Sequence, residues 1–561
     1  MHLCYGNELI LGKDERGVDV KLSRGQRSTH LYVAGSTGTG KSKFLEHLIR
    51  QDILNWRQSK SGLLLIDPHG SLYDSLMEWM AFHRLSRPVV PIDLRSDEWI
   101  VAYNMLRNRP GADPSVVVAH FVQAMAYVWG KTGTNETPLF ARWAENVLRT
   151  LYESKQTLVQ AEHLLDYIAS DVRRALTKQV KAPLVQSDWR KIDKLSAADF
   201  DSQVDSTVNR LRRFLGTEML RSMFGQPEVS LDLGRALEEG QIVLVNLAPK
   251  GLRVSEEDAS LFATLLLSDL WAAAKERGKG NAAAPVKPFY VYIDEFQNFV
   301  TPSIAQGLDQ ARGFGLHLTL AHQYPNQLLN AGPHGKAIYD SVMVNARSKA
   351  IFQVEGEENL KPLALSLFMG VMNPDEIKHR LYSTKVMGHQ KEMRRSISRS
   401  STTSESTSDG TGTTRLTEGT ADDRVSEHSS SSSGTSSGYS ETEMEVDAAV
   451  FGKELSSVQF RDLDEQKFRA MTALFTQEQQ ACIARLASER LPVSISVPKV
   501  ESFHLKPERI QQYVTKQAGK WQFLLPVAEA KAGLQLREDA IDKMVTMPNV
   551  EPKTARRKIG A

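Results

Sequence analysis

The chain has 561 residues, of which 41% are hydrophobic, and its 69 Lys and Arg nearly balance its 67 Asp and Glu for a formal net charge of +2. This length predicts roughly two to four domains or large insertions. The charge balance excludes a strongly basic body, so any DNA-binding surface must be local. The two cysteines, Cys4 and Cys482, have no metal-ligand spacing and cannot form a disulfide framework, so we interpret both as packing residues.

The sequence contains no signal for membrane insertion or secretion. No apolar run approaches the roughly 18 to 20 residues that a membrane span needs, and residues 1–12 lack the basic start and apolar stretch of a signal peptide. We therefore expect a soluble, cytoplasmic protein without an integral membrane segment.

The first structural signal is a phosphate-binding loop. Residues 35–42 read Gly-Ser-Thr-Gly-Thr-Gly-Lys-Ser and match G-x-x-x-x-G-K-[ST]. Residues 30–34 predict a buried strand before the loop, and a helix is predicted after it. The pattern predicts ATP and Mg²⁺ as cofactors: Lys41 would reach the β- and γ-phosphates, and Ser42 would contact the magnesium. The backbone of the loop would surround the phosphates through Gly35, Ser36, Thr37, Gly38, Thr39 and Gly40. The predicted helix has one apolar face, made of Phe44, Leu45, Leu48, Ile49 and Ile53.

Further apolar runs predict the other strands of a sheet. Several runs are continuous and do not alternate with polar residues, as expected of parallel strands that helices cover on both faces. We therefore predict an α/β fold with a mainly parallel sheet, whose later strands occupy residues 63–66, 89–94, 242–247, 289–293, 316–320, 350–354 and, last, 493–497.

A helical segment interrupts this pattern. Residues 105–234 contain helical periodicity, for example at 140–152 and 204–215, and no convincing strand. We interpret them as an all-helical insertion between a first core segment, 1–104, and a second, 235–395. The alternative is that some of these helices belong to the layers of the core.

The last third of the chain changes composition twice. Residues 396–447 are rich in Ser, Thr, Gly and Glu and predict a disordered linker, which we interpret as a flexible spacer in preference to a phosphorylated regulatory segment. Residues 448–500 return to the core, with a helix predicted over 460–491. Residues 501–561 predict a helical tail with a basic end at 553–558, which we interpret as solvated in preference to DNA-binding.

Polar side chains at the ends of predicted strands complete the candidate site. Asp294 and Glu295 follow the strand 289–293; Asp294 would hold magnesium through water, while Glu295 would point the other way and accept a proton from the water that attacks the γ-phosphate. Gln323, after the strand 316–320, would sense the γ-phosphate. Asp67 ends a strand expected beside the phosphate loop, where it would contact the magnesium shell or the attacking water, or simply form the turn Asp-Pro-His-Gly.

The chain has a single phosphate loop, which leaves one side of a bound nucleotide open. An arginine from a neighbouring subunit would close that side. Arg312, just before the strand 316–320, is the first candidate, and Arg347 is the second.

These motifs together resemble the HerA/FtsK superfamily of ring-forming, DNA-pumping ATPases, and within it the TraG/TrwB-type coupling proteins of conjugation. The resemblance spans residues 12–367. It implies a RecA-like P-loop NTPase core, a homo-oligomer that is a hexameric ring, and ATP-driven movement of double-stranded DNA through a central channel. The functional lysine, acidic pair, glutamine and arginine of the family correspond to Lys41, Asp294, Glu295, Gln323 and Arg312.

Two departures from the family leave several functions open. Membrane-embedded coupling proteins carry transmembrane helices before the core and HerA carries a barrel domain, whereas about thirty residues precede the phosphate loop here. We therefore expect a DNA translocase from a mobile element or an antiviral system, with a nuclease or another effector as partner. The alternatives are a coupling ATPase that delivers nucleoprotein, with a relaxase, to a type IV secretion channel, and an ATP-binding hexameric scaffold that regulates an effector.

Overall fold

The computed structural model divides the chain into two compact units. One comprises Met1–Met372 with Lys467–Ala561, and the other comprises Asn373–Gln466. The structure describes residues 8–104, 106–107, 113–130, 138–249, 254–279, 286–299, 301, 305, 307–330, 334–402 and 436–546.

The first unit is built on an eleven-stranded sheet with the order β2-β1-β14-β13-β10-β3-β9-β8-β4-β7-β5. All neighbours from β10 to β5 run parallel, which confirms the predicted mainly parallel sheet. Four antiparallel strands extend it beyond β10. The strands are β1 (Leu9–Lys13), β2 (Asp19–Leu22), β3 (Leu31–Ala34), β4 (Gly62–Asp67), β5 (Val89–Asp93), β7 (Ile242–Asn246), β8 (Phe289–Ile293), β9 (Leu316–His322), β10 (Ser348–Ile351), β13 (Ala481–Arg485) and β14 (Val493–Ser496).

Helices bury both faces of this sheet, which is why its parallel strands are apolar throughout. In β3, Leu31 and Val33 face one core, while Tyr32 and Ala34 face the other. The first core lies under α2 (Lys41–Ser59), α3 (Ser71–Phe82) and α19 (Pro507–Ala518), and the second under α11 (Leu233–Glu239) and α12 (Glu256–Lys279). The predicted apolar face of the helix after the phosphate loop is confirmed, since all five of its residues are fully buried in α2.

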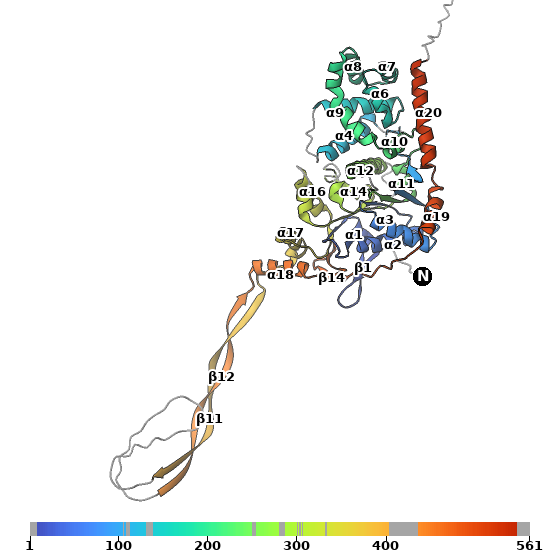
Figure 1. The fold of residues 1–561 in the computed structure, drawn as a ribbon. Helices are drawn as coiled ribbons and strands as arrows, with labels where there is room; N and C mark the ends of the chain where they lie inside the picture. The colour runs from blue at the N-terminus through green and yellow to red at the C-terminus, as the bar shows by residue number, and fades with distance from the viewer. Residues whose placement is uncertain are drawn as a thin grey trace, which may run out of the picture. The chain divides into compact units, whose positions relative to one another are not determined.

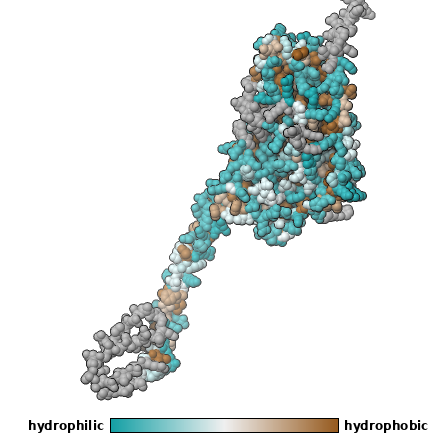
Figure 2. Space-filling model, viewed as in Figure 1, coloured by the Kyte–Doolittle hydropathy of each residue, from teal (hydrophilic) through white to brown (hydrophobic). Residues whose placement is uncertain are grey.

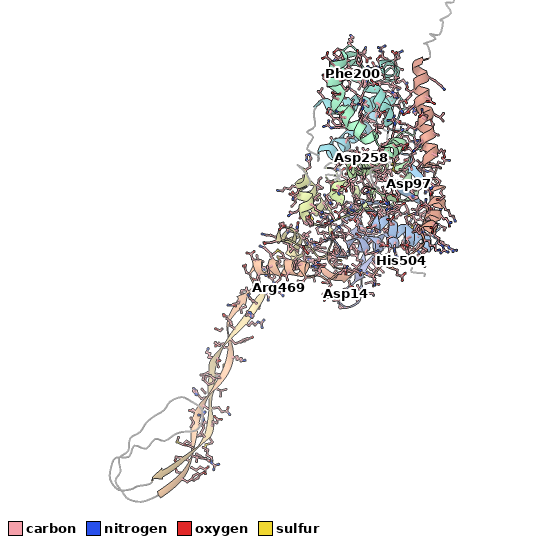
Figure 3. All side chains as sticks on the ribbon, viewed as in Figure 1. Asp14, Asp97, Phe200, Asp258, Arg469 and His504 are labelled. Carbon is pink, nitrogen blue, oxygen red and sulfur yellow. The ribbon has the colours of Figure 1, made fainter. Side chains whose placement is uncertain are left out.

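The described residues of the predicted helical insertion form helices, and no strand occurs among residues 113–130 and 138–234. Figure 1 shows α6 to α9 grouped together, and Phe200, labelled in Figure 3, lies in this group. The helices share one continuous core with α12. They are α4 (Pro114–Gly130), α5 (Pro138–Glu153), α6 (Ala161–Leu164), α7 (Ser170–Thr177), α8 (Pro183–Ile192), α9 (Ala197–Leu215) and α10 (Glu218–Phe224).

The C-terminal part of the first unit differs from the prediction. The helix expected over 460–491 ends earlier, as α18 (Leu463–Phe475), because the following residues form β13. The expected helical tail contains a short strand, β15 (Leu524–Pro526), which pairs antiparallel with β6 (Trp99–Val101) before α20 (Val527–Thr546). The basic end at 553–558 lies outside the described residues.

Shorter helices complete the first unit. They connect the strands or cover their ends: α1 (Arg24–Arg27), α14 (Leu308–Ala311), α15 (Pro325–Leu329), α16 (Gly335–Asn345) and α17 (Glu357–Phe368), with 3₁₀ turns η1 (Leu158–Gln160), η2 (Phe296–Asn298) and η3 (Met369–Val371). In the described part of the chain, none of the helices combines the length and the apolar character that a membrane crossing requires.

The second unit contains a long antiparallel hairpin of β11 (Ile377–Thr402) and β12 (Ser436–Phe460). The prediction of disorder over 396–447 is therefore wrong at both ends, and residues 403–435 lie outside the described part. Composition predicted that this segment builds no core, and its described residues, 396–402 and 436–447, do not belong to the buried clusters. A hairpin can form without one, because its backbone groups pair across the ladder and ion pairs such as Lys391 with Glu445, at 3.1 Å, cross it.

The strand order also corrects the expected place of Asp67. Its strand, β4, is separated from β3 by β8 and β9. Asp67 is therefore a neighbour of the acidic strand β8, and it does not lie directly beside the phosphate loop.

We expect the stability of the protein to fall in mild acid because of buried histidines in β9. Burial, reinforced by nearby cations such as Arg27, lowers the pKa of His317 to about 3, whereas an unfolded histidine titrates near 6.5. The unfolded state therefore binds a proton that the folded state excludes, and stability is lost as the pH falls from about 6.5 towards 3.

The variant His317→Leu should lose less stability than the wild type between pH 7 and pH 5, by up to about 2 kcal/mol. Thermal unfolding midpoints at the two pH values measure this difference. His322, whose pKa is lowered in the same way, remains in both proteins, so part of the acid sensitivity should persist. Equal losses in the two proteins would contradict the prediction.

Candidate active site

The phosphate loop connects β3 to the first turn of α2, as predicted. Gly38 and Gly40 have φ angles of 83° and 111°, in the region that favours glycine. Gly40 is the N-cap of α2; no side chain hydrogen-bonds the start of this helix among the described residues, and no acidic residue lies in its first turn. The N–H groups at the start of a helix need acceptors and carry partial positive charge, so this helix end suits an anion such as phosphate.

Two of the predicted phosphate-binding residues instead attach the loop to the sheet. The N–H of Gly35 donates to the carbonyl oxygen of Gln323 at 3.1 Å, and that of Ser36 donates to Gln353 O at 2.8 Å. These two N–H groups therefore fix the entrance of the loop between β9 and β10. The loop residues left as candidates for phosphate binding are those nearer to α2, from Thr37 to Ser42.

A segment far along the chain supports the other side of the loop. Gln479 Nε2 donates to Gly38 O at 3.0 Å, and Gln480 N donates to Thr39 O at 2.8 Å. A β-carbon on Gly40 would come within 3.0 Å of the Cα of Gln480, so glycine is required here for contact as well as for conformation. The sequence contains no local signal that places Gln479 and Gln480 at this loop.

Lys41 lies in a buried charged cluster at the carboxyl ends of the strands. Its Nζ is 3.2 Å from Glu295 Oε1 and 3.9 Å from Asp294 Oδ1. All three residues are at most 6% exposed. Gln323 Nε2 donates to Glu295 Oε1 at 3.3 Å, because β9 lies between β3 and β8. The structure thus brings Lys41, the acidic pair and Gln323 together.

Gln297 is a further member of the cluster that the sequence analysis did not identify. Its Nε2 donates to Glu295 Oε2 at 2.8 Å from the turn η2. Both oxygens of Glu295 therefore have a partner, and the carboxylate is held in one position. Its place two residues after Glu295 is the only sequence signal for this role.

The backbone of Glu295 corrects the predicted direction of its side chain. We expected Glu295 to point away from Asp294, as in an extended strand, but both carboxylates face Lys41. The reason is that β8 ends at Ile293 and Glu295 takes the left-handed conformation, with φ 47° and ψ 48°. This conformation costs a residue with a β-carbon about 1 to 2 kcal/mol, which the contacts of the carboxylate offset.

A bound cation would stabilise the ionised form of the Asp294 carboxylate. Burial raises its pKa to about 6, and the nearby charges of Glu295 and Asp67 act in the same direction, while Lys41 opposes them. No group of three or more His, Cys, Asp or Glu that could hold a metal occurs among the described residues. Magnesium at nucleotide sites needs only one or two protein ligands besides phosphates and water, so Asp294 and Ser42 fit this ion.

Two roles were predicted for Asp67, at the magnesium site or in the turn after β4, and its hydrogen bonds are those of the turn. Its Oδ1 accepts from His69 N at 3.0 Å and its Oδ2 from Tyr73 N at 2.8 Å, so it shapes the turn into α3. The side chain is buried, which raises its pKa. Its charge acts on Asp294 from the neighbouring strand.

The two candidate arginines lie at the other end of the sheet. Arg312 and Arg347 are exposed and precede the amino ends of β9 and β10, whereas Gln323 and the phosphate loop follow carboxyl ends. A strand of the length of β9 spans about 20 Å. Neither arginine therefore belongs to the Lys41 cluster of its own chain.

His322 has a structural place in the core. It is fully buried, with Nε2 at 2.5 Å from the hydroxyl of Tyr32. Burial, and secondarily the charge of Lys41, lowers its pKa to about 3. The ring is therefore neutral at physiological pH.

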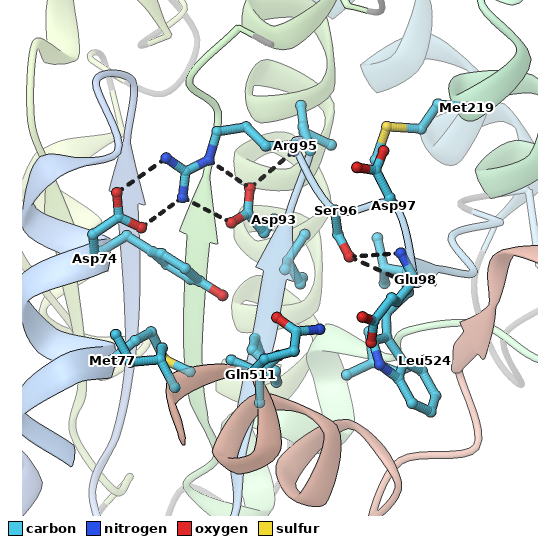
Figure 4. A pocket seen from close by; sticks show the side chains of 18 of the residues that line it. Asp74, Met77, Asp93, Arg95, Ser96, Asp97, Glu98, Met219, Gln511 and Leu524 are labelled. Atoms are coloured by element: carbon cyan, nitrogen blue, oxygen red, sulfur yellow. Dashed lines mark hydrogen bonds and ion pairs between the residues drawn. The ribbon is translucent and has the colours of Figure 1, made fainter. Parts of the chain in front are cut away.

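A separate cavity of about 570 Å³ lies at the edge strand β5, between α3 and α19. Figure 4 shows Arg95 there between Asp74 and Asp93, with hydrogen bonds of 3.0 Å to Asp74 Oδ2 and 2.9 Å to Asp93 Oδ2. Arg95 pairs with two of the four carboxylates of the lining, which also includes Asp97 and Glu98. The cavity is on the far side of β7, β4, β8 and β9 from the phosphate loop, so it is not the site that the motifs predicted.

We expect the left-handed backbone of Glu295 to be measurable in a pair of variants. Glu295→Gly and Glu295→Ala both remove the carboxylate, but only alanine keeps the strain of a β-carbon at positive φ. The glycine variant should be more stable by about 1 kcal/mol. Urea unfolding of the two proteins, side by side, measures the difference, and an alanine variant at least as stable as the glycine variant would contradict it.

Comparisons with known proteins show that the segment with the phosphate loop matches a known protein family. Residues 6–110 match the family model for the central domain of the helicase HerA. No curated protein sequence matches the chain. Three solved structures are similar at 13% identity over 90% of this chain: the bacterial conjugative coupling protein TrwBdeltaN70, with a TM-score of 0.49 over 90% of its own chain; plasmid coupling protein TrwB in complex with the non-hydrolysable ATP analogue ADPNP, with 0.48 over 92%; and VirB4 of Thermoanaerobacter pseudethanolicus, with 0.47 over 99%.

The structural similarities are too low to assign an activity, so the assignment depends on the family match and on the residues of the site. The family match covers the phosphate loop and β4, and the acidic strand and Gln323 complete the arrangement outside it. The chain is therefore similar to the P-loop ATPases of the HerA/FtsK type, with residues 6–110 matching the model of the HerA central domain.

Proposed function

We propose that the chain hydrolyses ATP with Mg²⁺ at the Lys41 cluster. One observation carries this proposal: a lysine after the phosphate loop, a carboxylate and an amide meet at the carboxyl ends of three adjacent strands, with contacts of 3.2 and 3.3 Å. The start of α2 beside them is open to an anion. This is the arrangement that phosphoryl transfer to water needs.

The residues of the cluster would divide the chemistry as follows. Ser42 and Asp294 would hold Mg²⁺, which neutralises phosphate charge when bound. Lys41, now paired with Glu295, would instead contact the β- and γ-phosphates. Glu295 would then be released to accept a proton from the attacking water. Gln323 donates to the same oxygen of Glu295, so its hydrogen bond would change with the state of that carboxylate.

We further propose that several copies form a ring in which each active site is completed by its neighbour. Arg312 and Arg347 lie at the opposite end of the sheet from Lys41 and are exposed, so they would serve the site of an adjacent copy. A hexamer is the arrangement that the family resemblance implies. The family model belongs to a helicase, which supports double-stranded DNA as the substrate that the ring moves. A mobile-element or antiviral role, in the cytoplasm, is the setting we propose.

Substitutions in the cluster test the ATPase proposal. Lys41→Ala should lower the rate of ATP hydrolysis at least about 100-fold, because phosphate charge loses its main donor. Glu295→Gln should lower it by about 10² to 10⁴, because the proton acceptor is lost. Lys43→Ala is the matched control: Lys43 is two residues further along α2 and pairs with Glu46 at 2.9 Å, away from the cluster.

The measurement is steady-state phosphate release by the purified protein, with and without double-stranded DNA. Stimulation by DNA that weakens steeply with salt would support translocation. Unchanged turnover in Lys41→Ala would overturn the ATPase proposal. Turnover that DNA does not change would overturn only the DNA substrate and would favour a scaffold role.

A mixing experiment tests whether Arg312 acts on a neighbouring copy. Arg312→Ala alone should lower the rate about 10³-fold or more, as removal of an arginine finger does, and Lys41→Ala alone should also be inactive. In mixed assemblies some intact Lys41 sites face an intact Arg312, so mixing should restore part of the activity. Arg347→Ala, mixed with Lys41→Ala in the same way, tests whether the second candidate acts between copies. Two inactive proteins that stay inactive when mixed would show that Arg312 does not act between copies.

A further inference from the structure

The hairpin of the second unit has two long open edges. A two-stranded ribbon is at best marginally stable alone, and strands of globular proteins usually have about 3 to 10 residues. Here β11 and β12 pair from Ile377 with Phe460 to Thr402 with Ser436. On each strand, the backbone groups that point away from the partner have no place in this ladder. Such edges are templates for pairing with another chain.

The two edges carry opposite charge. Residues 377–398 of β11 contain six Lys and Arg and one Glu, whereas residues 438–460 of β12 contain five Asp and Glu and one Lys. In an edge-to-edge contact, these charges favour β12 of a second copy beside β11. Pairing β11 with β11, or β12 with β12, would place like charges opposite each other, which destabilises a ladder.

Two exposed apolar pairs lie on one face of the hairpin, on either side of the pair Thr384 and Lys453. Val386 is directly opposite Phe451, and Tyr382 is opposite Leu455, so the four side chains lie on the same face. They are between 45% and 63% exposed. Figure 2 shows such apolar residues among the hydrophilic ones along the hairpin. Large apolar side chains that are grouped and exposed commonly mark an interaction surface.

We propose that the hairpins of neighbouring copies pair edge to edge, with β11 of one copy antiparallel to β12 of the next. In this head-to-tail arrangement each basic strand lies between two acidic ones, and the faces of successive hairpins that carry the apolar pairs join. Contacts of this kind close into a ring or continue as a filament. The proposal concerns a surface outside the ATPase site and does not depend on ATP hydrolysis.

A second copy fits the hairpin better than nucleic acid does. Over residues 377–398 and 438–460, the charges of the two strands almost cancel, so the hairpin as a whole has little attraction for a polyanion. Its lysines also have carboxylate neighbours in the same hairpin: Lys385 is 3.0 Å from Glu454 and Lys391 is 3.1 Å from Glu445.

Disulfide trapping in the full-length protein tests the pairing. One set of chains carries Gln390→Cys in β11, and the other carries one cysteine in β12, at Val446→Cys, Ala448→Cys or Val450→Cys, so that the register need not be known. Cys4→Ser is included in all chains, and Cys482 is buried. Oxidation should link the two sets at least tenfold more than it links Gln390→Cys chains to one another, because a disulfide requires Cα atoms within about 7 Å.

Charge reversal then tests the reason for the pairing. Reversing β11 in the Gln390→Cys chains, with Lys385→Glu, Lys391→Glu and Arg394→Glu, should lower the yield at least tenfold. Reversing β12 in the partner chains, with Glu441→Lys, Glu445→Lys and Glu454→Lys, should restore it, which a merely unfolded hairpin would not do. Adding Lys41→Ala should leave the yield unchanged and so separates this proposal from the ATPase. Equal yields in all pairings, no link at any β12 position, or links that form only when DNA is added would overturn it.

Discussion

The ion pair between Lys41 and Glu295 is the interaction on which the arrangement of the candidate site depends. A buried ammonium group without a carboxylate would cost several kcal/mol, so the acidic strand end stabilises Lys41 at the start of α2. The pair spans 3.2 Å, from the helix after β3 to the residue after β8, with β9 between those strands. It therefore requires the three strands to be adjacent, and it places Gln323 between the loop and the carboxylate.

A second buried ion pair joins α2 to α1, and a hydrogen bond from β8 reaches the same carboxylate. Arg27 donates to both oxygens of Asp52, at 2.8 and 2.7 Å, and the hydroxyl of Tyr292 donates to Asp52 at 2.6 Å. Asp52 is in α2, and Tyr292 is in β8. The middle of α2 is thus fixed to β8 through Asp52, independently of Lys41. Lys41 can exchange Glu295 for another anion without detaching α2 from the sheet.

The sequence was informative where one short segment determines both structure and chemistry. The phosphate loop, the strand ending at Ile293 and the strand before Gln323 are contiguous apolar runs with polar ends, so their places in a parallel sheet were predictable. The left-handed conformation of Glu295 was not predictable, because nothing in the sequence Asp-Glu-Phe-Gln distinguishes a turn from one more extended residue. The role of Gln479 was not predictable either, because its contact with Gly38 joins residues that only the folded sheet brings together. The hairpin was missed because composition predicts cores, and this element has none.

The connectivity of the chain relates these separate features. The second unit is inserted between β10 and β13, which are neighbours in the sheet. The chain that returns from the hairpin passes through α18 and reaches Gln479 and Gln480 just before β13. These two residues contact the backbone of the phosphate loop at 3.0 and 2.8 Å. The shape of the loop therefore depends on a segment that is covalently continuous with the hairpin, and the folding of β13 into the sheet is a condition for an intact phosphate site.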